Sequence, residues 1–192
     1  MRARDEVKIM EYRAIGMVEL NSVAKGIECA DQMMKTATLE IVTARPSCPG
    51  RYLIMVSGDV GSIQNAVDVG KSAADEFLVD WFIIPNASPE LFPALNGTTQ
   101  IREIDALGII ETYSVASCIA AADGAAKAAD VDLMEIRCAT GLAGKSFVIL
   151  TGDVGSVKAA VDAGVDIVQE EGLMVCHVVL PAPDKDLIER LL

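Results

Sequence analysis

The chain has 192 residues, with 16 lysine and arginine against 28 aspartate and glutamate residues, and a formal net charge of −12 at pH 7. Such acidity argues against a nucleic-acid binder and against docking on a membrane surface of anionic lipid, because both depend on clustered cations. Hydrophobic residues make up 52% of the chain and aromatic residues only 4%, so the core must consist mostly of small aliphatic side chains. A monomer this small and apolar would leave much apolar surface exposed, which indicates an assembly.

The first half of the chain predicts six regular elements. In chain order they are a strand at 14–20, a helix capped by Ser22, strands at 39–45 and 52–57, a helix capped by Asp59 and a strand at 79–84. Serine and aspartate favour the N-cap because their side-chain oxygens accept hydrogen bonds from the first turn of a helix. The first helix is expected to turn one apolar stripe toward a sheet. That stripe consists of Val23, Ile27, Ala30, Met34 and Ala37.

The second half repeats the first. AIGMVELNSVAKGIECADQMMK, from Ala14, returns as ALGIIETYSVASCIAAADGAAK from Ala106, and GDVGSIQNAVDVG, from Gly58, returns as GDVGSVKAAVDAG from Gly152. The chain is therefore a tandem duplication of one domain. The repeated elements are a strand at 106–112, a helix capped by Ser114, strands at 131–137 and 146–151, a helix capped by Asp153 and a strand at 174–180.

The element order β-α-β-β-α-β is the split βαβ pattern of a ferredoxin-like sandwich. We therefore predict an α+β fold with two tandem domains, each an antiparallel sheet with both helices on one face. The linker between them begins with turn-forming residues and lacks an apolar period. The predicted boundaries are an N-terminal extension at 1–13, a first domain at 14–95, a linker at 96–105 and a second domain at 106–192.

The residues that could carry catalysis do not form a recognisable set. The single histidine, His177, falls in the last predicted strand, where a lone imidazole is expected in the core or at an interface. The sequence GLAGKS, at 141–146, resembles the end of a phosphate loop, but its first glycine is missing and a strand follows where a helix is needed. A glycine-rich turn between strands is the favoured interpretation, and the chain is predicted not to be an enzyme.

The cysteines differ in their surroundings. The sequence shows neither a membrane span nor an export signal, so five irregularly spaced cysteines are typical of reduced thiols in a cytosol. Cysteines on predicted helices and strands are expected to serve as small buried hydrophobes. Cys48 lies instead in the loop RPSCPG, between two prolines that stiffen the backbone. A thiol on such a loop is a candidate metal ligand or redox group.

The repeated motifs resemble the BMC domain of bacterial microcompartment shell proteins, present twice. Tandem-domain members of that family form trimers that mimic the hexamers of single-domain members. The resemblance therefore implies a homotrimer, pseudohexameric in shape, that tiles a microcompartment shell in the cytoplasm together with other shell proteins. Encapsulated redox enzymes are further candidate partners.

The loop of Cys48 is similar to a loop in a tandem-domain shell protein of propanediol-utilisation compartments. The resemblance implies that Cys48 of three subunits binds one shared 4Fe–4S cluster on the trimer axis, for electron transfer across the shell. In the family the loops between the two middle strands line the central pore. Matching positions here are Ser47 and Pro49 in the first domain, and Gly141, Leu142 and Ala143 in the second.

A lysine at the tile edge is a further family feature. Its matches are Lys35 and Lys127, which the resemblance places along the contact with a neighbouring tile. Two alternative functions remain open. In one, the tile lacks a cluster and its central pore conducts metabolites, so that Cys48 is incidental. In the other, the tandem units form a small-molecule sensor, an interpretation that rests on fold analogy alone.

Overall fold

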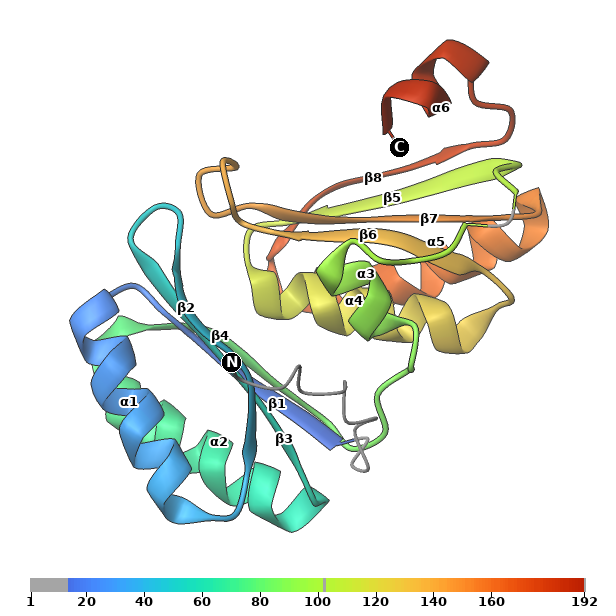
Figure 1. The fold of residues 1–192 in the computed structure, drawn as a ribbon. Coiled ribbons are helices and arrows are strands. Elements are labelled where there is room, and N and C mark those ends of the chain that lie inside the picture. The colour runs from blue at the N-terminus through green and yellow to red at the C-terminus, as the bar shows by residue number, and fades with distance from the viewer. Residues whose placement is uncertain (1–13, 102, 192) are drawn as a thin grey trace, which may run out of the picture.

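The computed structural model describes residues 14–101 and 103–191, and shows two units of one design (Figure 1). The predicted extension at 1–13 lies outside the described residues. The first unit consists of β1 (Ala14–Leu20), α1 (Val23–Thr36), β2 (Glu40–Ser47), β3 (Arg51–Gly58), α2 (Val60–Ala74) and β4 (Leu78–Ile84). The second consists of β5 (Ala106–Thr112), α4 (Val115–Ala128), β6 (Asp132–Cys138), β7 (Ser146–Gly152), α5 (Val154–Val168) and β8 (Met174–Leu180).

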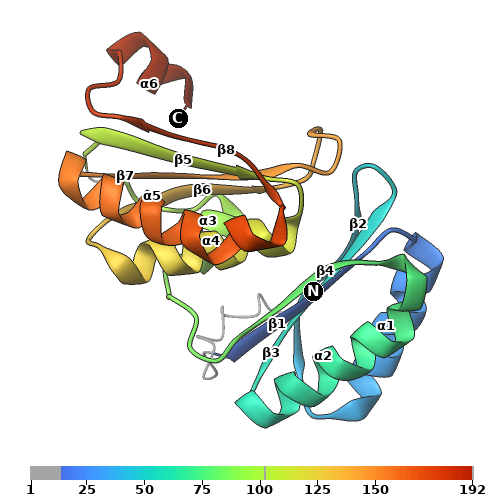
Figure 2. The ribbon, with the colours of Figure 1, turned by 180° about the vertical axis from the view of Figure 1, so that it is seen from behind.

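Each unit is an antiparallel sheet of four strands, in the order β2-β3-β1-β4 or β6-β7-β5-β8. Both long helices of a unit lie on one face of its sheet, as the two opposite views show (Figures 1 and 2). We call this face of each sheet the inner face, and the opposite one the outer face. The order, the antiparallel pairing and the one-sided helices confirm the predicted α+β, ferredoxin-like fold.

The four predicted N-caps are confirmed. Ser22 Oγ accepts a hydrogen bond from the backbone N–H of Lys25 at 3.3 Å, and Asp59 Oδ1 accepts from that of Ser62 at 2.9 Å. Ser114 and Asp153 cap α4 and α5 in the same way. Hydrogen bonds from the side chain and backbone of Ser62 lower the pKa of Asp59, because they favour the carboxylate.

Two short helices that the sequence did not predict follow the last strand of each unit. They are α3 (Leu91–Asn96) after β4 and α6 (Lys185–Leu191) after β8. A proline inside LFPALN and a length of about two turns leave too weak a pattern for prediction. Leu91 and Ala94 of α3 are buried because the helix packs on β6 of the second unit.

The apolar stripe predicted for α1 is confirmed only in part, since Ala30 and Met34 are partly buried and pack against the core of the first unit. The side of α1 that meets its own sheet carries Gly26, Cys29 and Met33, whereas Val23 and Ile27 are 37% and 55% exposed. A Cβ on Gly26 would lie only 2.4 Å from Cβ of Tyr52, so the glycine lets the helix approach β3 closely. The prediction included Val23 and Ile27, but the residues buried against the sheet are Gly26, Cys29 and Met33.

The two central strands of the first sheet, β1 and β3, are buried on both faces. Its inner face packs against α1 and α2, while Met17, Leu53 and Phe82 on its outer face share a core with α4 of the second unit. We call the contact of this outer face with α3 and α4 the domain seam. Helix α4 therefore lies between two sheets, with its own sheet on one side and the first sheet on the other (Figure 1).

The outer face of the second sheet is covered less completely. Leu107, Met134 and Ile149 are buried there, with Ile101 and Ile104 of the connection packed against them. The side chain of Val178 is 41% exposed on β8. Within the described ranges, every helix is too short or too polar to cross a bilayer.

Candidate functional site

The hairpin between β2 and β3 presents Cys48 at its tip. Its strands extend to Ser47 and from Arg51, so the turn itself holds only Cys48, Pro49 and Gly50. The N–H of Gly50 donates to the carbonyl of Ser47 at 3.0 Å, and Gly50 has a φ of +82°, a conformation that glycine adopts without strain. Cys48 and Pro49 are exposed, and the Cys48–Pro49 peptide bond is cis. The hairpin thus holds one thiol in solvent on a tightly closed turn.

The corresponding turn between β6 and β7 carries no exposed thiol. Gly141 and Ala143 are exposed and have positive φ angles of 74° and 51°, and Leu142 between them is half-buried. The N–H of Lys145 donates to the carbonyl of Leu142 at 3.1 Å, which closes the turn. Cys138 stands at the base of this turn and is buried.

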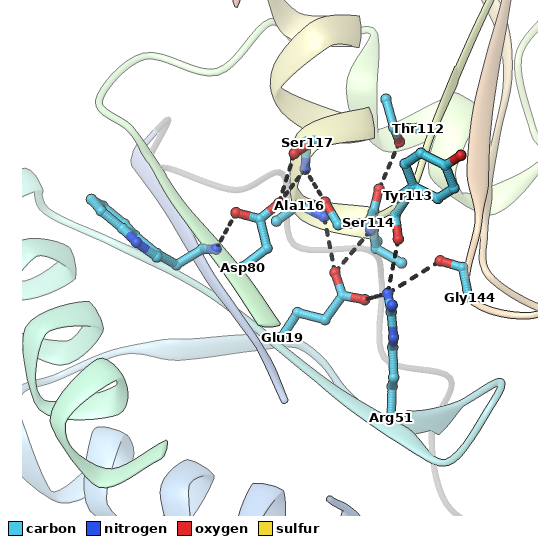
Figure 3. Close-up of polar contacts among 11 residues, drawn as sticks. Glu19, Arg51, Asp80, Thr112, Tyr113, Ser114, Ala116, Ser117 and Gly144 are labelled. Carbon is cyan, nitrogen blue, oxygen red and sulfur yellow. Dashed lines mark hydrogen bonds and ion pairs between the residues drawn. The ribbon is translucent and has the colours of Figure 1, made fainter. Parts of the chain in front are cut away.

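The two turns lie side by side in one chain. Arg51 Nη1, at the start of β3, donates to the carbonyl of Gly144 at 3.2 Å (Figure 3). A Cβ on Gly144 would lie 3.0 Å from Cδ of Pro49, and Gly144 has a φ of +91°, so a side chain there would be crowded and strained. The residues predicted to line the pore therefore come together at one end of the molecule. Their place around a threefold axis stays a prediction.

Two of the five cysteines are exposed, Cys48 and Cys176. Burial raises the pKa of Cys29 and of Cys138 to about 11, and raises that of Cys118 well above the usual thiol value. The buried thiols are therefore poor ligands, because the thiolate is the form that binds metal. Cys48 is the exposed cysteine of the loops, whereas Cys176 lies on β8.

A row of polar side chains on the outer face of the first sheet receives the N-terminus of α4 (Figure 3). Glu19 Oε2 accepts hydrogen bonds from the N–H of Val115 at 2.8 Å and of Ala116 at 3.3 Å, and its other oxygen pairs with Arg51. Burial raises the pKa of Glu19, against the lowering effect of Arg51 and the two N–H groups. A helix N-terminus favours a carboxylate because its N–H groups lack partners within the helix.

Asp80 on β4 completes this polar row. Its Oδ2 accepts from the N–H of Ser117 at 3.1 Å and from the hydroxyl of Ser117 at 2.7 Å, and it also accepts from the hydroxyl of Ser114. Sequence reasoning assigned Ser114 to its own helix and missed the carboxylates from the other domain. The available signal was an acidic residue inside each of two apolar strands, Glu19 in AIGMVEL and Asp80 in LVDWFII.

The two predicted tile-edge lysines have different surroundings. Lys35 Nζ pairs with Asp31 at 2.6 Å, and both side chains are more than half exposed. Lys127 pairs with Asp123, which is buried and also accepts from the N–H of Ser88 at 2.7 Å. Lys127 is thus tied to the segment that leaves β4, whereas Lys35 faces solvent. A contact of either lysine with a neighbouring tile stays a prediction.

Comparison with known proteins gives consistent matches over both units. The BMC domain family matches residues 14–87 and again residues 106–183. The bacterial microcompartment shell protein PduT of Citrobacter freundii is 40% identical, over 93% of this chain and 97% of its own. A solved microcompartment protein from Desulfitobacterium hafniense DCB has a TM-score of 0.81 and 49% identity, over 92% of this chain and 98% of its own.

A more distant structure shares the fold alone. The fused permuted hexameric shell protein MSM0275 from the RMM microcompartment has a TM-score of 0.62 at 17% identity, over 80% of this chain and 83% of its own. Taken with the duplicated fold, the family match shows that the chain belongs to the BMC domain family of bacterial microcompartment shell proteins. It is a structural protein of the PduT type, not an enzyme, and its place is the shell in the bacterial cytoplasm.

Proposed function

We propose that three copies of the chain form a pseudohexameric shell tile that holds one 4Fe–4S cluster on its threefold axis through Cys48. The observation that carries the cluster is the exposed thiol at the tip of the β2–β3 hairpin. Threefold symmetry converts one such thiol per chain into three that face a common axis. Three thiolates are most of the four that a cubane cluster usually takes from protein.

The residues present fit such a shared site. Among the described residues of one chain, no three His, Cys, Asp or Glu side chains are grouped so that they could hold a metal ion. In the proposed site the metal centre draws its ligands from several copies, with Cys48 supplying one from each. The fourth iron ligand would come from water or a small molecule. The 40% identity to PduT supports the shell tile and leaves the cluster to experiment.

The cluster, when bound, supplies one-electron transfer. The protein's part is to hold the three thiols on short, closed turns and to keep the axis open enough for electron partners to approach. Arg51 contributes by tying the β2–β3 hairpin to the carbonyl of Gly144. Other shell proteins would surround the tile, and encapsulated redox enzymes would exchange electrons with it.

The test is anaerobic purification followed by iron and sulfide analysis, EPR spectroscopy and measurement of the oligomer mass. We expect a trimer with about four irons, the content of one cubane. Cys48→Ser should give a colourless trimer, and the matched control Cys176→Ser, which removes the other exposed thiol, should keep the cluster. A wild-type trimer without iron and sulfide would leave the alternative function, a central pore that conducts metabolites.

A further inference from the structure

A cavity of about 170 Å³ lies in the domain seam, between the outer face of the first sheet and helices α3 and α4. Its wall is mostly apolar and is formed by Met17, Leu53 and Met55 of the sheet and by Val115 and Ile119 of α4. Each of these side chains is at most 3% exposed. An engineered apolar cavity of about 150 Å³ in another protein binds benzene. The cavity of the domain seam therefore has room for an apolar group of about that size.

One side of this cavity is polar and meets solvent. Thr43 and Arg45 of β2 and Asn96 of α3 line it there, and both Arg45 and Asn96 are exposed. Cys138 also lines the cavity; burial raises the pKa of its thiol, and the positive charge of Arg45 opposes that rise. The guanidinium of Arg45 therefore acts on the interior of the cavity as well as on the solvent side.

The duplicated sequence supplies a second cavity for comparison, on the outer face of the second sheet. Its lining includes the residues that match four lining residues of the first cavity. The four pairs are Val42 and Met134, Thr43 and Glu135, Arg45 and Arg137, and Met55 and Ile149. The strand register is also the same, since β2 and β6 carry an irregularity at the same place in their pairing with β3 and β7. The two cavities are thus built on one local design.

The two cavities differ in what neutralises the arginine. Nε and Nη2 of Arg137 both donate to Oε1 of Glu135, at 2.8 Å and 2.6 Å. The matching position of β2 holds Thr43, which carries no charge. Within residues 14–101 and 103–191, no carboxylate pairs with Arg45. The first cavity therefore has the cation of this pair without its anion.

We propose that the cavity of the domain seam binds a small monocarboxylate with an apolar body, and that Arg45 pairs with its carboxylate. The ligand's carboxylate takes the part that Glu135 plays beside Arg137, and its body fills the apolar interior. One arginine balances one negative charge, whereas a second charge would lie against apolar side chains without a partner, which disfavours dicarboxylates and phosphate. The site is separate from the turn of Cys48, so it does not depend on a cluster.

The experiment is a titration of the purified protein with pentanoate, followed through the NMR signals of isotope-labelled methionine methyl groups. Met17 and Met55 line the cavity, whereas Met33 is buried in the core between the first sheet and its own helices. We expect saturable shifts at Met17 and Met55 and none at Met33. Pentanol has the same body without the charge, and glutarate has a second carboxylate. Each should bind about 10-fold more weakly than pentanoate, or weaker still.

Three variants test the role of the arginine. Arg45→Gln should raise the dissociation constant of pentanoate about 10-fold or more, the loss expected for a hydrogen bond between charged groups. Thr43→Glu should weaken binding at least as much, because it gives Arg45 the internal carboxylate that Arg137 already has. The matched control is Arg137→Gln, which should leave the affinity unchanged. Circular dichroism of all three variants should stay that of the wild type.

The outcomes decide both parts of the proposal. Shifts at Met17 and Met55 that Arg45→Gln and Thr43→Glu weaken, and Arg137→Gln does not, support the site. Equal affinities for pentanoate and pentanol, unchanged in Arg45→Gln, overturn the recognition of an anion. The absence of saturable shifts, or shifts confined to Met134 in the second cavity, overturns the ligand site itself. None of these results depends on iron content, so the proposed cluster is tested separately.

Discussion

The two units of the chain have the same elements but differ in what covers their sheets. The central strands of the first sheet are covered by its own helices on one face and by α4 on the other, whereas the outer face of the second sheet leaves Val178 41% exposed. The difference follows from packing, since α4 shares a core with the outer face of the first sheet, whereas Ile101 and Ile104 of the connection pack on that of the second.

The largest expected difference in stability is between substitutions of Glu19 and Glu111, which occupy matching positions of the two units. Glu19→Ala removes the partner of Arg51 and of two helix N–H groups in a buried place, and should lower the free energy of unfolding by about 3–5 kcal/mol. Glu111→Ala breaks an ion pair that is partly exposed, and should cost about 0–1 kcal/mol in the separated chain. Urea unfolding of the two variants checks this. Equal losses would contradict the distinction between a closed and an open face.

A smaller effect should appear where helix meets sheet. Gly26→Ala places a Cβ against Tyr52, and should cost about 1–3 kcal/mol through overpacking. At the matching positions of the second unit stand Cys118 and Ser146, so that there the larger residue is on the helix and the smaller one on the strand. The double variant Gly26→Ala, Tyr52→Ser should therefore lose less stability in thermal unfolding than the sum of the losses of the two single variants.

The control for that substitution is Gly61→Ala on α2. A Cβ there would meet only Asp59 Oδ1, at 3.4 Å, so stability should change little. Helix propensity favours alanine over glycine at both positions, so equal losses at Gly26 and Gly61 would show that the contact with β3 does not explain the glycine.

Thiol reactivity should divide the cysteines by burial. At pH 8, in protein without cluster, only Cys48 and Cys176 should react with a small disulfide reagent, because they are the exposed cysteines. Cys29 and Cys138 should react only on unfolding, because burial raises their pKa to about 11 and blocks access. Mass spectrometry of labelled peptides identifies the sites. Rapid labelling of Cys138 in folded protein would contradict its place at the base of the turn.

The smallest effect concerns the helix caps, where the two units should behave alike. The folded-state pKa values of Asp59 and Asp153 are lowered, so the stabilisation is present above the unfolded value and is lost as pH falls through the folded value. Asp59→Asn and Asp153→Asn should each flatten the decline of stability below about pH 4, near the unfolded pKa of aspartate. Thermal unfolding between pH 3 and pH 7 would measure it. A change at one cap only would contradict the expectation that the two exposed caps behave alike.

The sequence predicted the elements that depend on neighbours along the chain. Caps such as Ser22 and Asp59, and the order of strands and helices, follow from local hydrogen bonding and apolar patterns. The side of α1 that meets the sheet did not follow, because its small residues, Gly26 and Cys29, carry a weaker apolar signal than Val23 and Ile27. Val23 and Ile27 are exposed, whereas Val115 and Ile119, at the matching positions of α4, are buried in the domain seam.

The sequence predicted only the part of the candidate site that lies within a single loop. Cys48 stood out because prolines flank it in a loop, and the structure places it exposed at a hairpin tip. The row of Glu19 and Asp80 could not be predicted, since it joins strands of one domain to a helix that begins at Ser114 in the other. Contacts of this kind depend on how the domains pack, and a local sequence pattern does not indicate which elements pack against each other.

The central claim is that three chains assemble around one cluster held by Cys48. Native mass spectrometry of anaerobically purified protein tests it most directly, because one spectrum reports the number of chains and the bound mass together. We predict a trimer that carries the mass of a single 4Fe–4S cluster, and a trimer of Cys48→Ser without it. A wild-type trimer with no added mass, or a cluster retained by Cys48→Ser, would contradict the claim.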